Sequence, residues 1–111
     1  MSPSDRLTLT PIEGTDPNRQ LYALQGPLTL ADLLTVQEAL ASPASVLVLD
    51  LSGVPYVDSA GVGVLVQSTV SRKRKGQRLA VVAPNETVKK LFSLTMVDSV
   101  LEIYPSLDAV K

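Results

Sequence analysis

The sequence predicts an α/β fold: a single domain with a mixed, mainly parallel β-sheet of about four to five strands and packed α-helices. Two observations lead to this prediction. After an opening pair of strands, short apolar segments rich in β-branched residues alternate with longer segments of helical spacing. One short segment, residues 46–51, is apolar almost throughout, as in a central strand covered on both faces. Strands and helices in this order form right-handed parallel crossovers.

The N-terminal part is predicted to form a hairpin followed by a helix. Residues 7–12 alternate apolar and polar side chains, and residues 14–18 have the composition of a turn. The return strand is expected at residues 20–24. Helical spacing follows, with Thr29 as the expected N-cap and Ser42-Pro43 just beyond the end of the helix.

Local preferences conflict in residues 59–75, because two glycines and several valines favour a strand. The segment is nevertheless predicted as a helix, since about seventeen residues exceed the length of most strands. The basic run at residues 72–75, just before Gly76, also suits the end of a helix. The glycines would let this helix sit close to the sheet. The side chains expected on its buried face are Val62, Leu65, Val66 and Val70.

The C-terminal third continues the alternation. Another buried strand is predicted at residues 78–83, and a helix opens at Pro84-Asn85. The side chains expected to point inward from this helix are Val88, Leu91 and Phe92. A last strand or extended segment is expected at residues 100–103, and Ser106 is the expected cap of a short terminal turn that contains Leu107 and Val110.

Composition limits the possible functions. The chain has 111 residues, of which 45% are apolar, and residues 1–111 are predicted as one domain with residues 1–5 as a flexible N-terminus. The absence of cysteine and histidine excludes thiolate catalysis, Ser-His-Asp hydrolysis and the usual zinc sites. A formal charge of -1 and 4% aromatic residues argue against direct nucleic-acid binding. No leader or membrane span is visible, so a cytoplasmic protein without membrane insertion is expected.

The best-marked junction between a strand and a helix lies at residues 52–63. An apolar loop, Ser52-Gly53-Val54-Pro55-Tyr56-Val57, follows the buried strand, and the next helix opens on Asp58-Ser59-Ala60-Gly61-Val62-Gly63. In open α/β sheets, ligands and modifications gather at such junctions, because free backbone N–H groups and the helix dipole are exposed there. Ser59 is therefore predicted to lie at the start of the helix.

Residues 49–65 resemble the signature of STAS-domain anti-anti-sigma factors, which are also called anti-sigma factor antagonists, and a weaker similarity extends over nearly the whole chain. In that bacterial signalling family, the serine after the aspartate is phosphorylated by a partner that is both a serine kinase and an anti-sigma factor. Only the unphosphorylated form binds that partner and frees the sigma factor. The resemblance implies that Ser59 is the phosphorylated residue, and that a serine phosphatase restores the active form.

The same resemblance implies a binding protein that regulates transcription by partner switching, and not an enzyme. No catalytic residue, cofactor or metal ligand is therefore assigned. The residues expected to bind the partner are Ser52, Gly53, Val54, Pro55, Tyr56, Val57, Asp58, Ala60, Gly61 and Val62. A phosphate at Ser59 would add about -1.5 to -2 charges at a helix start that tolerates them, so we expect lost docking and an unchanged fold.

Simpler interpretations stand beside these. An Asp-Ser pair before a helix is most often an N-cap, and Asp58 is either such a cap or, by family analogy, a carboxylate near the kinase's nucleotide and metal. Gly61 and Gly63 are only a fragment of a dinucleotide fingerprint, so packing is their predicted role. Asp50 and Ser52 are expected to satisfy backbone groups of the loop. The basic run at residues 72–75 either compensates the helix dipole in solvent or docks to an acidic partner or nucleic acid.

The chain departs from the family pattern at two places. Thr29 stands where the family often has an aspartate near the phosphorylated serine, and threonine offers no carboxylate. Thr95-Met96-Val97 stands where a Gly-Leu pair is common, so the exit of that helix is expected to differ. The alternative function is a STAS structural subunit, either of a signalling assembly or on the cytoplasmic side of a membrane transporter. The oligomeric state is left open.

Overall fold

The computed structural model describes residues 6–14 and 16–110. The predicted flexible N-terminus, residues 1–5, lies outside the described residues. The strands are β1 (Thr8–Ile12), β2 (Arg19–Gln25), β3 (Val46–Gly53), β4 (Arg78–Val82) and β5 (Glu102–Tyr104). The α-helices are α1 (Leu33–Leu40), α2 (Ser59–Arg74) and α3 (Glu86–Leu94), and short 3-10 helices are η2 (Leu30–Asp32), η3 (Val97–Ser99) and η4 (Leu107–Ala109).

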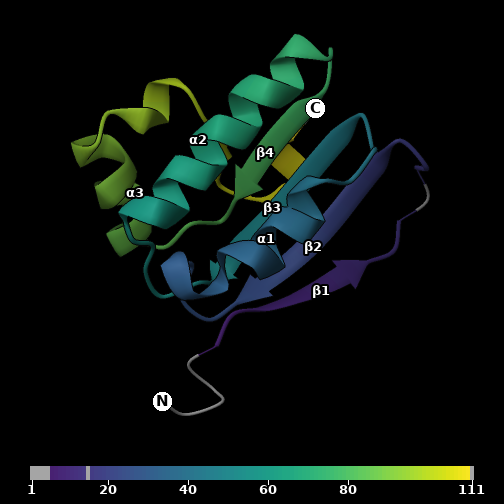
Figure 1. Ribbon diagram of the computed structural model, residues 1–111. Helices are drawn as coiled ribbons and strands as arrows, with labels where there is room; N and C mark the ends of the chain where they lie inside the picture. Colours follow the sequence, from purple (N-terminus) through teal and green to yellow (C-terminus); the bar gives the residue numbers. More distant parts are fainter. Residues whose placement is uncertain (1–5, 15, 111) are drawn as a thin grey trace.

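The strands form one mixed sheet in the order β1-β2-β3-β4-β5 (Figure 1). β1 and β2 pair antiparallel as the predicted hairpin, whereas β2, β3, β4 and β5 pair parallel in succession. Each parallel step is made through a helix, because strands that run the same way need a long crossover. The predicted mixed, mainly parallel sheet is confirmed.

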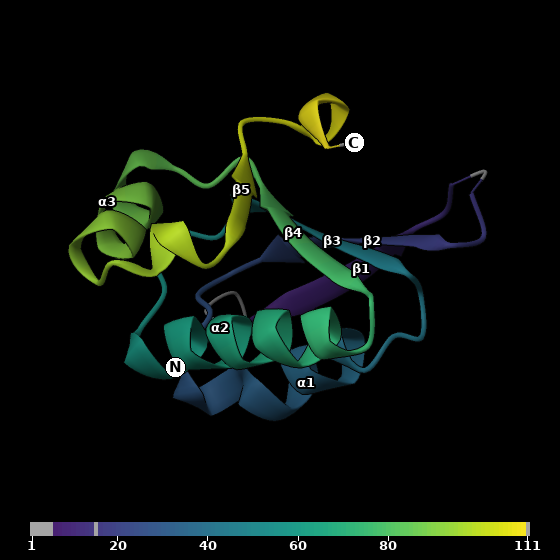
Figure 2. The ribbon, with the colours of Figure 1, turned by 90° about the horizontal axis from the view of Figure 1, so that it is seen from above.

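The helices and the sheet enclose a main core on one side of β3. Helices α1 and α2 lie side by side on that face of the sheet, and η4 lies on the opposite side (Figures 1 and 2). Leu47, Leu49 and Leu51 of β3 belong to the main core, to which all three α-helices contribute. Val48 belongs instead to a smaller cluster that includes Val110. β3 is thus covered on both faces, as its composition predicts.

Residues 59–74 form a helix despite their glycines and valines, because burial against the sheet outweighs local propensity. The buried row differs from the predicted one. Val70 is 38% exposed, since it lies about 140° around the helix from Leu65, and Thr69 and Arg72 are buried in its stead. Gly61 allows close packing, because an added Cβ would lie 2.5 Å from the Leu28 carbonyl oxygen. Gly63 has open space around it and has no such role.

Three predicted element ends need correction. Thr29 and Ser106 precede η2 and η4, but neither side chain makes a capping hydrogen bond, because both helices are single 3-10 turns. The last strand is Glu102–Tyr104, not 100–103, since Val100 and Leu101 donate backbone hydrogen bonds to Val97. The exit of α3 does lack the family's glycine: Met96 itself adopts the left-handed conformation, with φ of 61°.

Candidate functional site at the start of α2

Backbone hydrogen bonds attach the loop between β3 and α2 to residues 26–28, which follow β2. Gly26 donates its backbone N–H to the Gly53 carbonyl at 3.0 Å, and Leu28 donates to the Tyr56 carbonyl at 3.1 Å. Asp58 returns a bond by donating to the Leu28 carbonyl at 3.1 Å. These bonds place the start of α2 beside the turn that leads into α1, at one end of the sheet (Figure 1).

Asp58 is the N-cap of α2, and both of its carboxylate oxygens are engaged. Oδ1 accepts the backbone N–H of Gly61 at 2.8 Å, and Oδ2 accepts that of Leu30 at 3.0 Å. The capping interpretation of Asp58 is therefore confirmed. The second bond satisfies the N–H of Leu30, the first residue of η2, with a carboxylate from a different part of the chain.

Ser59 is the first residue of α2, and it is exposed. Among residues 6–14 and 16–110, no hydrogen-bond partner is found for its hydroxyl. Asp58 supplies the cap, so the fold does not need the Ser59 side chain. The first N–H groups of a helix have no intrahelical acceptor, and they lie next to this hydroxyl at the positive end of the helix dipole.

The predicted docking residues divide into an inner and an outer group. Val54, Val57 and Val62 are buried and their side chains belong to the core, while the buried Gly61 lets the backbone approach Leu28 closely. Ser52, Pro55, Tyr56 and Ser59 are exposed, while Gly53, Asp58 and Ala60 are half-buried. The loop borders a depression of about 450 Å³ that is also lined by Gly26, Pro27 and Asn85. Asp50 satisfies the loop backbone as predicted, because its Oδ1 accepts the Ser52 N–H at 2.9 Å.

The structure adds two exposed apolar residues, Leu30 and Leu34, that the sequence analysis missed, beside the predicted Tyr56. Leu30 and Leu34 are 68% and 80% exposed, and Tyr56 is 51% exposed. The Leu30 backbone is bonded to Asp58, so this side chain flanks the start of α2. Helical spacing in residues 30–40 does not distinguish an inward leucine from an exposed one. The structure shows that Val36 and Ala39 form the buried row of α1 without Leu34.

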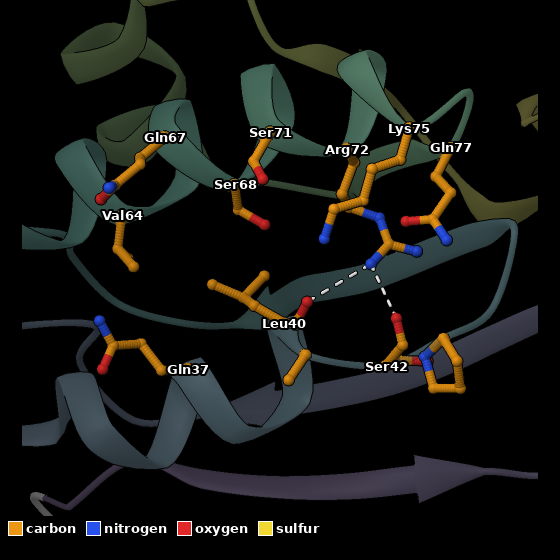
Figure 3. A pocket seen from close by; sticks show the side chains of 12 residues that line it. Gln37, Leu40, Ser42, Val64, Gln67, Ser68, Ser71, Arg72, Lys75 and Gln77 are labelled. Carbon is orange, nitrogen blue, oxygen red and sulfur yellow. Dashed lines mark hydrogen bonds between the residues drawn. The ribbon is translucent and has the colours of Figure 1, made fainter.

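The opposite end of α2 faces a groove of about 560 Å³ between α1 and α2 (Figure 3). Arg72 is only 4% exposed there, and burial lowers the pKa of its guanidinium. Its N–H groups donate to the carbonyls of Arg78, Leu40 and Ser42 at 3.0, 3.3 and 3.0 Å, and to that of Ala44. The interpretation as a solvated helix end thus fits residues 73–75, which are exposed, but is wrong for Arg72, whose side chain is buried.

Two possible functional features are not found in the part of the chain that the structure describes. No group of three or more histidine, cysteine, aspartate or glutamate residues there could hold a metal ion. No described helix has the length and apolar character needed to cross a membrane.

A model of the STAS domain family matches residues 12–110, and the chain therefore belongs to this family. A curated protein of Thermotoga maritima, named as a candidate anti-sigma factor antagonist, is 39% identical over 59 residues. The match covers 53% of this chain and 52% of that protein. The chain thus spans about half the length of the curated relatives that it matches.

Solved structures with the same fold include an anti-sigma factor antagonist from Mycobacterium paratuberculosis, with a TM-score of 0.74, 22% identity, and coverage of 97% of this chain and 93% of that one. The anti-sigma factor antagonist SpoIIAA in its unphosphorylated form has a TM-score of 0.72 at 15% identity, with 92% of both chains covered. A sulfate transporter family protein from Wolinella succinogenes has a TM-score of 0.72 at 15% identity, with 86% and 84% covered. These similarities establish a shared fold.

Proposed function

We propose that this STAS domain is an anti-sigma factor antagonist, and that phosphorylation of Ser59 switches off its binding to an anti-sigma factor with serine kinase activity. The observation that carries the proposal is that Asp58 and Ser59 have different roles at the start of α2. Asp58 caps the helix with both oxygens, which leaves the Ser59 hydroxyl exposed and able to accept a phosphate. Membership of the STAS family and the name of the Thermotoga maritima relative support the same function.

The start of α2 is suited to carry a phosphate without unfolding. A phosphate on Ser59 would lie at the positive end of the helix dipole, close to N–H groups that have no intrahelical partner. The capping bonds of Asp58 do not involve Ser59 and would persist. We therefore expect the modification to change the surface and to leave the packing of the domain intact.

The surroundings of Ser59 explain how a phosphate would block docking. Leu30, whose backbone bonds to Asp58, and Tyr56 present exposed apolar area near the start of α2, the kind of surface that a partner covers in the centre of an interface. A phosphate would place about -1.5 to -2 charges beside this area. Docking would then require the removal of water from that charge, at a cost of a few kcal/mol. A phosphatase that removes the phosphate would restore binding.

In this proposal, the domain is a binding protein and a kinase substrate rather than a catalyst. The exposed loop residues Ser52, Pro55 and Tyr56 would contact the partner directly. The buried residues Val54 and Val57 would fix the shape of the loop from below.

The test uses wild-type, Ser59→Ala and Ser59→Asp proteins as baits in a lysate of the source organism. Ser71→Asp is the matched control, because it adds the same charge to another exposed serine of α2. We expect a serine kinase to be retained by the wild type, Ser59→Ala and Ser71→Asp, and to bind Ser59→Asp about 100-fold more weakly. Mass spectrometry should place phosphate on Ser59 of the wild-type bait.

A second function, a STAS subunit of a signalling assembly or of a membrane transporter, is compatible with the fold shared with the Wolinella succinogenes protein. The same experiment separates the two functions. Capture of the same transporter or scaffold subunits by all four baits would reject the phosphorylation switch and favour the second function.

A further inference from the structure

Asn85 connects the start of α3 to the loop that precedes Ser59. Its Oδ1 accepts the backbone N–H of Val88 at 2.8 Å and so caps α3. Its Nδ2 donates to the carbonyls of Val54 and Pro55, at 3.2 and 3.3 Å. One exposed amide thus spans two segments that are about thirty residues apart in the chain.

The orientation of this amide follows from its chemistry. The N–H of Val88 needs an acceptor, which only the amide oxygen can supply. The NH₂ group must then face the opposite way, toward the two loop carbonyls. A carboxylate at position 85 could keep the cap but could not donate to those carbonyls.

The connection that places Asn85 is strained. Ala83 has a φ of 55°, a left-handed conformation that residues with a Cβ rarely adopt. It is held there by its backbone N–H, which donates to the Tyr104 carbonyl at 2.9 Å, and by the buried Pro84 that follows. Strain of this kind persists only where the surrounding structure enforces it, and it is often found near functional sites. Here the left-handed conformation of Ala83 lies two residues before Asn85, in the connection that places Asn85 beside the loop.

We propose that Asn85 is a positioning residue that holds the loop 52–57 in the shape presented to a partner. The loop carbonyls of Val54 and Pro55 belong to the rim of the 450 Å³ depression that Asn85 also lines. Without the amide donor, the loop keeps its bonds to the 26–28 segment but loses its attachment on the α3 side. The start of α3 therefore borders the same depression as the loop that leads to Ser59. The effect on docking rests on the function proposed above, whereas the effect on the loop does not.

The first test measures amide hydrogen exchange of the free protein carrying Asn85→Asp. The backbone N–H groups of Leu28, Val54 and Asp58 report on the loop and its attachments. Leu28 donates to Tyr56 of the loop, Val54 of the loop donates to Leu51 of β3, and Asp58, just after the loop, donates to Leu28. We expect their exchange to become about fivefold faster, because the two long hydrogen bonds from Asn85 Nδ2 are lost, while the exchange of Lys89 and Phe92 in α3 is unchanged. Unchanged exchange at the three loop amides would overturn the proposal.

Two further variants separate the loss of the amide donor from the gain of a negative charge. Asn85→Ser keeps a capping oxygen without adding charge, and it should loosen the loop in the same way. Asn18→Asp adds the same charge in the turn between β1 and β2, and it should leave the loop amides unchanged. If Asn18→Asp also accelerates their exchange, the effect is one of net charge and the positioning role is rejected.

The second test concerns docking. Asn85→Asp and Asn85→Ser should weaken the complex with the serine kinase about fivefold, whereas Asn18→Asp should bind as the wild type does. A loosened loop with unchanged kinase binding would reject the role in docking. The two proposals can fail separately. If the loop exchanges faster in the Asn85 variants but no partner depends on Ser59, the function proposed above is rejected while the positioning of the loop is established.

Discussion

Helix α2 begins and ends on a charged side chain, but the two ends differ in what they leave available. At the start, Asp58 takes up the N–H groups of Gly61 and Leu30, and the neighbouring Ser59 is exposed. At the end, Arg72 is buried and donates to four backbone carbonyls. Both charges complement the helix dipole. The start of α2 therefore exposes the Ser59 hydroxyl, whereas the end of α2 stabilises the fold through the buried Arg72.

The carbonyls at the Arg72 end come from separate parts of the fold. Leu40 ends α1, Ser42 and Ala44 lie between α1 and β3, and Arg78 begins β4. One guanidinium therefore joins α1, α2, the connection between α1 and β3, and the first residue of β4 (Figure 3). Its planar array of donors suits this task better than the single ammonium of lysine.

The largest expected effect is at Arg72. Arg72→Ala should lower the free energy of unfolding by about 3 to 4 kcal/mol, because four carbonyls lose a charged donor at a buried position. Arg74→Ala removes an exposed charge from the same helix end and should change it by less than about 0.5 kcal/mol. Urea unfolding measures both. Arg72→Lys, which keeps the charge but not the planar donors, should be intermediate and serves if the alanine variant does not fold.

Equal stability of Arg72→Ala and Arg74→Ala would contradict this view of the helix end. Arg72 would then be only another member of a solvated basic run.

The next effect is at the other end of α2. Asp58→Ala should lower the free energy of unfolding by about 1 to 2 kcal/mol, since the cap of α2 and the acceptor for Leu30 are both lost. Ser59→Ala should change it by less than about 0.5 kcal/mol, because the serine hydroxyl bonds to nothing in the described structure. Thermal unfolding of the two variants compares them directly. A larger loss for Ser59→Ala than for Asp58→Ala would reverse the assigned roles.

The smallest expected effect is a difference in pH dependence between Arg72 and Arg78. Arg78 pairs with a carboxylate, whereas Arg72 bonds to backbone carbonyls. Arg78 donates to Glu102 at 2.6 Å, and this hydrogen bond, with a further one from Tyr104, holds the pKa of Glu102 below its usual value. The ion pair therefore stabilises the fold above the usual glutamate range and is lost as the pH falls through the lowered pKa. Carbonyls do not titrate, so the contribution of Arg72 should be constant over the same range.

Glu102→Gln should accordingly cost about 0.5 to 1 kcal/mol near pH 7, with a difference from the wild type that shrinks toward pH 3. The loss in Arg72→Lys should be the same at both values. Urea unfolding at the two pH values measures both losses. If the loss of unfolding free energy in Glu102→Gln is the same at pH 7 and pH 3, the two arginines do not differ in this way.

Most of the fold could be predicted from local patterns. Alternating side chains and a turn predict the opening hairpin, and the apolar segment at residues 46–51 predicts the central strand. These signals are strong because strand and helix periods are set by backbone geometry within a few residues. The junction that holds Ser59 was also visible, because a strand, a loop and a capped helix follow one another directly in the chain.

Other features depended on the packing of distant segments. The basic run has the same sequence whether Arg72 is solvated or buried. Arg72 is buried only because the end of α1 and the start of β4 pack around it and accept its hydrogen bonds. Asn85 has the sequence of an ordinary helix cap, and its contact with the loop exists only because β3 and β4 are neighbours.

The sequence by itself determined the order of strands and helices, the mixed, mainly parallel sheet and the position of Ser59 at a helix start. Tertiary structure alone decided which charged groups are engaged and which surfaces stay open. The physical reason is range: propensities, caps and periodicity act over a few residues, whereas burial and hydrogen bonding between distant segments arise only when the chain brings them together.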